Sequence, residues 1–502
     1  MNKPLPNELW FTILSFLEDR DVQCLSGISS VFFTAALDRR YEKVEILSFD
    51  RATVAKLERL QDPFVAKRVR MLLLYTGAVN ILSSWQVRDR ELGSTLPWRL
   101  SRIKSLASHL LPSKAESRAA LRAQDSLRPT KMRTDQIIAL LARVVPQFVN
   151  IKTYFLDWSS IWPLGSDPEP SYLQPIWQTI GKKLRSLHLC IPPRKLQVIA
   201  SELCLIGSLE ELHVTFPAGN DVLDSVPTSS TLTTNMLTLF TQFRNTLKVF
   251  AISSFAAFDM SSFFAELGYF PNVRRIRLCL RLRQLQLRDA TGLTRFLSDH
   301  AFQVERLEVL MSEFLLDGEC ATFVFPSVPF PRLKSLVLII DQRFALAPTI
   351  PTAITHVLSK LETLLLEERY HSHSDLLAWT TAFSEITRTP NLRRLDISLF
   401  SLNKQVIDLL AVTFPLLETL RLRCISVGTM DKMLDPSGFI AEMGPWSYPE
   451  WQLRSVYLRV RRRGQPGSVV SEETLLAALV RSIPSIRSTE TFRPSRTWIG
   501  MG

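Results

Sequence analysis

Residues that could carry out chemistry are few and scattered along this chain. Neither a phosphate-binding G-x-x-x-x-G-K-[ST] loop nor a G-x-S-x-G nucleophile motif occurs in its 502 residues, which include 17 glycines. His371 and His373 lie one residue apart in Y-H-S-H-S. Without a nearby set of cysteine or carboxylate ligands, a polar turn is favoured there over a metal site. The sequence therefore predicts a non-catalytic protein with no metal or cofactor.

Two other histidines and the cysteines are also interpreted as structural or surface residues. His188 and His213 occupy equivalent positions in two similar segments, so we expect them to lie close together as packing or binding-surface residues. No two cysteines form a C-x-x-C pair. Buried thiols are therefore favoured over zinc ligands or disulfides for Cys24, Cys190, Cys204, Cys279, Cys320 and Cys424.

The elements that position these side chains recur along the body of the chain. An L-x-x-L-x-L pattern of aliphatic residues returns about every 30 residues, with segments that begin at Ile151, Leu184, Leu209, Leu247, Val273, Val304, Leu333, Leu361, Leu392, Leu417 and Leu453. The pattern turns three aliphatic side chains to one face of a short strand. Helical patterns such as 236–243 lie between the strands. Stacked units of this kind bury one continuous core.

These segments resemble irregular leucine-rich repeats. The standard repeat has Asn or Cys eight positions after the first Leu, but here those positions are Pro192, Pro217, Phe255, Arg281, Ser312, Asp341, Arg369, Phe400, Ile425 and Arg461. The usual side-chain ladder is therefore missing, and the sequence does not predict the curvature. A non-repetitive α/β domain with chance matches is the alternative, which the regular spacing disfavours.

The apolar spacing of the first forty residues predicts a cluster of short amphipathic helices. An apolar stripe at helical spacing comprises Leu9, Ile13, Leu14, Phe16 and Leu17. Two further apolar runs follow, around Val22 and from Val31 to Leu37. So short a stretch cannot bury this much surface alone, which implies contact with a partner or with the rest of the chain. A helical cap on a larger domain is the alternative interpretation.

The same stretch resembles the F-box, with its pattern L-P-x-E-[LI]-x-x-x-I-[LF]-x-x-L. The matching residues are Leu5, Pro6, Glu8, Leu9, Ile13, Leu14, Leu17, Asp21, Val22, Leu25, Ile28 and Ser29. Phe32 stands where the family favours Trp. The resemblance implies docking on a Skp-type adaptor, which bridges to a cullin, through Leu5, Pro6, Leu9, Ile13, Leu14 and Leu17. Where an F-box precedes leucine-rich repeats, the repeats usually select the substrate.

Composition limits the other classes of function. No run of about 18 apolar residues and no secretory signal pattern occurs, so we expect no membrane partner and a cytoplasmic or nuclear location. The formal charge of +12 is compatible with an acidic partner, nucleic acid or a nuclear address. Residues 99–133 contain nine Lys or Arg. Because these charges are dispersed, a solvated insertion is favoured over a nucleic-acid site.

Arginine dominates the outward strand positions of the later repeats. These positions, two, four and six residues after the first aliphatic, include Arg275, Arg277, Arg306, Arg394, Arg421, Arg423 and Arg459, with Tyr457 beside the last. Arginine binds carboxylate and phosphate through paired hydrogen bonds. All but Arg306 are therefore candidate substrate-binding residues for an acidic or phosphorylated segment. Cross-strand pairing with Glu308, Glu367 and Asp396 is the alternative, and it is favoured because exposed charge pairs are common.

Taken together, the sequence predicts an α/β protein with N-terminal F-box helices and a leucine-rich-repeat-like solenoid with a parallel sheet. The expected divisions are an F-box domain at 1–42, a linking region with imperfect repeats at 43–150, a solenoid at 151–490 and a tail at 491–502. The predicted function is a substrate-recruiting adaptor subunit of a Skp–cullin–F-box ubiquitin ligase, with an unidentified protein substrate. A basic repeat scaffold that binds nucleic acid or an acidic protein, independently of ubiquitination, is the alternative.

Overall fold

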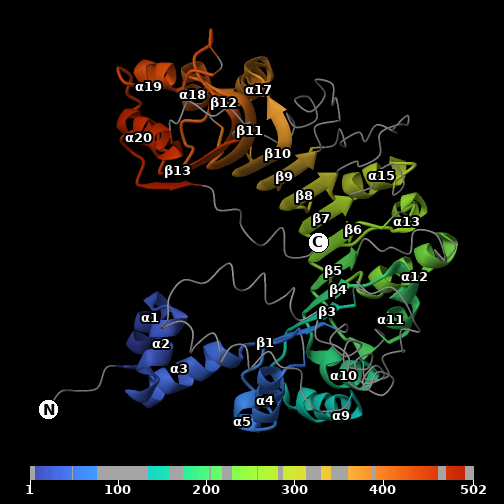
Figure 1. The fold of residues 1–502 in the computed structure, drawn as a ribbon. Helices are drawn as coiled ribbons and strands as arrows, with labels where there is room; N and C mark the ends of the chain where they lie inside the picture. The colour runs from blue at the N-terminus through green and yellow to red at the C-terminus, as the bar shows by residue number, and fades with distance from the viewer. Residues whose placement is uncertain are drawn as a thin grey trace, which may run out of the picture. The chain divides into compact units, whose positions relative to one another are not determined.

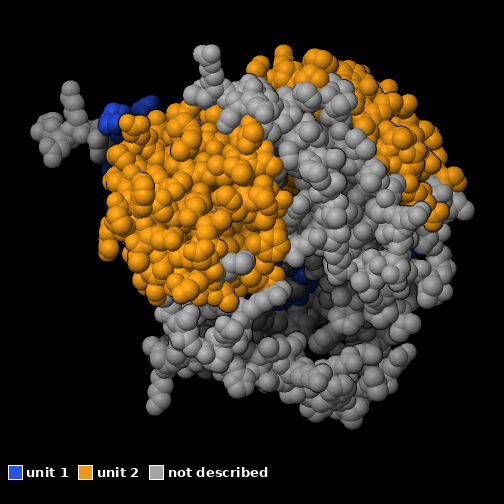
Figure 2. All heavy atoms as spheres, turned by 90° about the horizontal axis from the view of Figure 1, so that it is seen from above, with its two compact units in different colours: residues 1–214 blue, residues 215–502 orange. Residues whose placement is uncertain are grey.

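The computed structural model describes residues 6–47, 49–75, 134–158, 173–202, 205–217, 229–256, 258–280, 287–311, 329–340, 360–386, 390–432, 434–461 and 471–491 (Figure 1). The chain divides into two compact units, Met1–Val214 and Thr215–Gly502, which are coloured separately in Figure 2. Both units consist of parallel strands that pair in chain order, with helices between them. The predicted α/β class with strand–helix repeats is confirmed.

Unit 1 begins with a helical cluster formed by α1 (Asn7–Phe16), α2 (Asp19–Cys24), η1 (Leu25–Gly27) and α3 (Ser30–Tyr41). Ser29 caps α3, because its hydroxyl accepts a hydrogen bond from the backbone N–H of Phe32. Leu14, Val22, Phe32 and Ala36 form the buried core of this cluster. The rings of Trp10 and Phe32 meet edge to face, with centroids 5.4 Å apart. Each of the three α-helices thus supplies one or two side chains to a shared core.

The first strand–helix repeats complete unit 1. In chain order they are β1 (Lys43–Ile46), α4 (Arg51–Arg59), α5 (Pro63–Ala66), β2 (Met71–Tyr75), α9 (Thr134–Val144), η2 (Val145–Gln147), β3 (Thr153–Asp157), α10 (Leu173–Ile180), η3 (Gly181–Lys183), β4 (Ser186–Cys190), η4 (Pro193–Lys195) and α11 (Leu196–Glu202). The division between the units falls within β5 (Glu211–Phe216). The basic insertion predicted at 99–133 and the predicted tail at 491–502, apart from Thr491, lie outside the described residues.

Unit 2 continues the repeats with longer strands. Its elements are α12 (Ser229–Gln242), β6 (Val249–Ser254), α13 (Ser261–Glu266), β7 (Arg275–Leu280), α15 (Thr291–His300), β8 (Arg306–Met311), β9 (Ser335–Ile340), β10 (Thr363–His371), α17 (His373–Ile386), β11 (Arg394–Leu402), α18 (Lys404–Thr413), β12 (Thr419–Val427), α19 (Pro436–Met443), β13 (Ser455–Val460), α20 (Glu472–Ser482) and β14 (Ser488–Thr491). Helices α12, α13 and α15 lie along one side of strands β6 to β8 (Figure 1). The opposite side of these strands carries the outward side chains.

Each predicted repeat corresponds to one strand, which starts two residues after the first aliphatic residue. Val273, just before β7, is buried together with Ile276 and Leu278 of the strand, whereas Arg275 and Arg277 alternate with the latter two. Equivalent positions pair between successive strands, as Arg275 with Arg306 and then Ser335. Strands β1, β2 and β14 extend the same pattern beyond the eleven predicted segments. The register shifts between β10 and β11 after Leu366, and before that point outward residues of equivalent position form rows across the strands.

Backbone hydrogen bonds join the repeats where the standard Asn is missing. Phe255 and Arg461 occupy two such positions. The backbone N–H of Phe255 donates to the carbonyl of Phe216 at 2.8 Å, and that of Arg461 donates to the carbonyl of Cys424 at 2.7 Å. Main-chain pairing with the preceding strand thus satisfies these donors without a side-chain ladder.

The helix side of unit 2 is packed with aromatic rings. Phe250 contacts Phe240, Phe270 and Phe296 at centroid distances of 4.6, 5.8 and 5.1 Å. Helices α13 and α15 approach so closely that a Cβ on Gly292 would lie 2.6 Å from the backbone nitrogen of Ala265. Among the described helices, none is long and apolar enough to cross a membrane.

Candidate functional site

The helix α1 presents an apolar face that its own cluster does not cover. Leu9, Ile13 and Phe16 lie on this face at spacings of four and three residues, and their side chains are 48%, 40% and 83% exposed. Phe11 on the same helix is also exposed. Exposed large apolar side chains on so small a cluster form a candidate interaction surface. We refer to Leu9, Ile13 and Phe16 as the α1 face.

The predicted docking residues divide between this face and the interior. Leu9 and Ile13 belong to the α1 face, and Pro6 is exposed at the start of the helix. Leu14 is instead buried in the cluster core, and Leu17 packs against that core. Leu5 lies outside the described residues. Phe16 was not among the predicted docking residues, although its spacing from Leu9 and Ile13 was the available signal.

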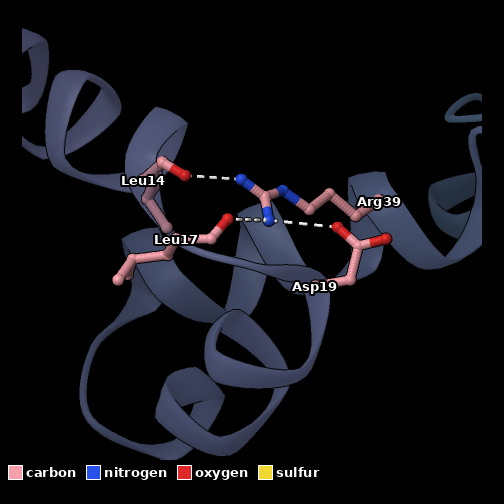
Figure 3. A network of polar contacts seen from close by, with 4 residues as sticks. All are labelled: Leu14, Leu17, Asp19 and Arg39. Carbon is pink, nitrogen blue, oxygen red and sulfur yellow. Dashed lines mark hydrogen bonds and ion pairs between the residues drawn. The ribbon is translucent and has the colours of Figure 1, made fainter. Parts of the chain in front are cut away.

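Arg39 holds the end of α1 against the rest of the cluster (Figure 3). Its guanidinium comes from α3 and donates to the carbonyl of Leu14 and, at 2.8 Å, to the carbonyl of Leu17. It also forms an ion pair with Asp19 at 3.0 Å. A cation at the last carbonyls of a helix compensates for their missing partners and for the helix dipole. Arg39 therefore fixes the orientation of α1 and of its exposed face.

The outward arginines of β7 and β8 share one carboxylate. Arg277 Nε lies 3.5 Å from Glu308 Oε2, and Arg306 Nε lies 2.6 Å from Glu308 Oε1. Arg275 is exposed and pairs in register with Arg306. At Arg277, therefore, the structure contains the cross-strand charge pair that the sequence offered as the alternative to an anion site.

A second group of arginines lies on β11, β12 and β13. Arg421 pairs in register with Tyr457, and its guanidinium lies over the Tyr457 ring, 4.5 Å from the centroid. Arg423 pairs in register with Arg459 and forms an ion pair with Asp396 at 3.3 Å. The remaining member of the group is Arg394 at the start of β11. We call Arg394, Arg421, Arg423, Tyr457 and Arg459 the arginine cluster.

Burial within the arginine cluster raises the free energy of its positive charge. Desolvation and, secondarily, the neighbouring Arg421 lower the pKa of Arg394, although Asp396 opposes this shift. Asp396 is buried and already forms the ion pair with Arg423. Arg421 Nε is also buried, and within the described structure it has no hydrogen-bond partner. A bound anion would relieve these unfavourable terms.

Apolar side chains separate the two arginine groups along part of the outward face, whereas Ser335 and Thr363 lie between Arg306 and Arg394 in register. Cys279, Leu310, Val337 and Ile339 form a buried cluster on outward positions of β7 to β9, with Phe255 and Leu365 packed against it. The predicted arginine face is therefore interrupted at the positions of this apolar cluster. The aliphatic residues at these outward positions are visible in the sequence as well.

Comparisons with known proteins give no family for the chain. No protein-family model matches it, and no curated protein matches it by sequence. Among solved structures it is similar to one described as the crystal structure of a Rad7 and Elc1 complex in yeast, with 13% identity and a TM-score of 0.34. That similarity covers 60% of this chain and 76% of the other.

Proposed function

We propose that the protein is a substrate-recruiting adaptor subunit of a Skp–cullin–F-box ubiquitin ligase. The N-terminal helices dock the Skp-type adaptor, and the outward strand face of the repeats holds the target protein. The α1 face is the observation that carries the proposal, because it adds exposed apolar surface to a stretch whose sequence resembles the F-box. The proposed docking surface thus consists of Pro6 with Leu9, Ile13 and Phe16, while Leu14 and Leu17 support it from inside.

Docking on this surface is driven by apolar burial. Covering one large apolar side chain is worth about 1.5–3 kcal/mol. Phe16 is 83% exposed and therefore gains most from a partner. A carboxylate at the same position would lose that gain and would also have to be desolvated. We expect Phe16→Asp to weaken adaptor binding by at least about tenfold, since 1.4 kcal/mol corresponds to a factor of ten.

The test is binding of the full-length chain to a purified Skp-type adaptor by calorimetry, with Phe16→Asp and Leu9→Asp as variants. Val412→Asp is the matched control, because Val412 is an apolar residue in α18 that is also 83% exposed. The proposal requires tight binding by the native chain and the control, and weakened binding by both α1 variants. No binding by the native chain, or equal binding by all four proteins, would contradict it.

For the target protein, we propose that the arginine cluster binds an acidic or phosphorylated segment. Arg394 and Arg421 act electrostatically on one another near the buried Asp396, which forms its ion pair with Arg423, and Arg459 follows Arg423 in register. Stacking on Tyr457 restricts the plane of the Arg421 guanidinium, which orients its paired N–H donors for an oxyanion. The arginines near Glu308 are excluded from the site, because that carboxylate pairs with Arg277 and Arg306.

This part of the proposal is tested with a defined probe rather than an unidentified target. A fluorescent peptide with phosphoserines among aspartates is titrated against the full chain, with its unphosphorylated form and duplex DNA as competitors. Charge-assisted hydrogen bonds contribute about 1.5–3 kcal/mol, so Arg421→Glu should weaken peptide binding at least about tenfold. Arg481→Glu, on the exposed side of α20, is the control for the change in charge. Preferential DNA binding would favour a nucleic-acid scaffold instead, and equal loss in both variants would exclude the cluster.

A further inference from the structure

Two histidines and a glutamate converge on neighbouring strands of unit 1. His188 lies on β4, and Glu211 and His213 lie on β5. One potential ligand atom from each of the three residues lies within 4.8 Å of the other two, and all three side chains are half-buried. The partial exposure leaves the donors reachable from solvent. The donor set of two imidazoles and one carboxylate is one that Zn²⁺ takes in sites with an open coordination position.

Ser186 prepares two of these residues for such a role. Its hydroxyl donates to Glu211 Oε2 at 2.9 Å and lies 3.1 Å from His188 Nε2. Since the serine has a single proton and gives it to the carboxylate, His188 Nε2–H must be the donor in the other contact. The neutral ring then carries its lone pair on Nδ1. A hydrogen bond that fixes the tautomer of a histidine through its other nitrogen is the usual support of a metal ligand.

The carboxylate keeps a donor atom beside this hydrogen bond. Glu211 uses Oε2 to accept from Ser186, and a carboxylate has a second oxygen that can bind an ion at the same time. Its negative charge also compensates part of the charge of a divalent cation. A divalent ion bound by two neutral imidazoles and one carboxylate would have a net charge of +1 together with its ligands.

Ring stacking holds the two imidazoles side by side. The rings of His188 and His213 are 4.0 Å apart and 12° from parallel, and Phe155 stacks on the other side of His188 at 3.8 Å. Lone pairs of parallel rings do not point to one atom, so metal binding requires one imidazole to turn about its Cβ–Cγ bond; a turn of His213 keeps the contact between Ser186 and His188. This torsion is broad and roughly two-fold in histidine, so the change is accessible without moving the strands.

From this geometry we propose that His188, Glu211 and His213 form a site for a divalent transition-metal ion of the zinc class. The ion has three protein ligands and takes its fourth from water. Ser186 is a positioning residue, which orients His188 and Glu211 without touching the ion. The site lies in unit 1 and is independent of both the α1 face and the arginine cluster.

The proposal is tested on the full-length chain with Zn²⁺ by calorimetry and with Co²⁺ by visible absorption, which reports the ligand geometry directly. His213→Phe preserves the ring stack but removes a ligand, and Glu211→Gln preserves shape but removes the charge. Ser186→Ala should reduce affinity roughly 10–100-fold, as expected for loss of an orienting partner. Both ligand variants should lose more than that. His373→Phe is the control, since His373 is a half-buried histidine in unit 2.

The expected result is one bound ion per chain with a Co²⁺ band typical of four-coordination, unchanged in His373→Phe. The proposal fails if the native chain shows no such band, or if Glu211→Gln and His213→Phe bind Zn²⁺ as tightly as the native chain. The measurement on the native chain decides the question even if a variant does not fold. The α1 variants should bind the ion normally, which separates this site from adaptor docking.

Discussion

Arg39 offers the sharpest test of how the N-terminal cluster is held together. Replacing it with Met keeps the apolar stem but removes the donors to the carbonyls of Leu14 and Leu17. Hydrogen bonds from a charged group contribute about 1.5–3 kcal/mol each. The Arg39 side chain is 27% exposed, and the freed carbonyls near the end of α1 gain access to water, so the lower end of this range applies. We therefore expect Arg39→Met to destabilise the cluster by about 2–3 kcal/mol.

Hydrogen exchange of the α1 amides measures this loss locally. When closing is faster than exchange, the exchange rate is proportional to the equilibrium constant for opening of the cluster. A loss of 1.4 kcal/mol in stability therefore speeds exchange tenfold. Arg39→Met should accelerate exchange in Asn7–Phe16 by about 30- to 150-fold, and exchange in unit 2 should stay constant. Asp19→Asn is the control, because Asp19 is 76% exposed and a surface ion pair contributes about 0–1 kcal/mol. If the control accelerates exchange as much as Arg39→Met, or if neither variant does, the carbonyl bonds do not stabilise the cluster.

Three further predictions concern unit 2. Gly292→Ala should lower the free energy of unfolding by about 1–3 kcal/mol through overpacking, because the added carbon would meet the Ala265 backbone. An unchanged urea midpoint would show that α13 and α15 move apart to admit the methyl group. Arg423→Met should cost about 3–5 kcal/mol, because it leaves Asp396 buried without this ion pair. Adding Asp396→Leu should recover most of that loss. If it does not, the loss does not come from the buried Asp396 carboxylate. Burial lowers the pKa of His300 below its ordinary value of 6.5, so below about pH 6.5 the unfolded chain binds more protons there. The stability that neutral His300 contributes is thus present above pH 6.5 and is lost as the pH falls through the folded pKa. Between pH 7.5 and 5, the free energy of unfolding measured in urea should fall less in His300→Gln than in the native chain. Equal falls in the two proteins would exclude His300 as the cause.

The repeats were predictable because their signal is local. Each L-x-x-L-x-L segment fixes which side chains of its own strand are buried, and every one of the eleven predicted segments forms a strand in the structure. The constant offset from the first aliphatic residue also fixes the register between neighbours. Hence the proximity of His188 and His213 could be predicted, and their rings stack at 4.0 Å. Their convergence with Glu211 follows from the same register, but its metal-binding arrangement depends on side-chain orientation, which periodicity does not encode.

The N-terminal helices show where local pattern is insufficient. The stripe from Leu9 to Leu17 is wide enough to cover more than one side of α1, so the sequence alone could not decide which part faces inward. Packing against Phe32 and Ala36 of α3 decides it, because this core buries Leu14 and leaves Phe16 exposed. The resemblance to the F-box identified the residues but not their division between core and surface.

The outward strand face shows the same limit for charge. The sequence determined that Arg275, Arg277, Arg421 and Arg423 project from one side of the strands, since alternation along a strand is fixed by backbone geometry. Only the tertiary structure decided which of them pair with a carboxylate. Arg277 lies near Glu308, Arg423 near the buried Asp396, and Arg421 over Tyr457. These partners come from neighbouring repeats more than 25 residues away, so their distances depend on strand pairing and side-chain packing rather than on any local pattern.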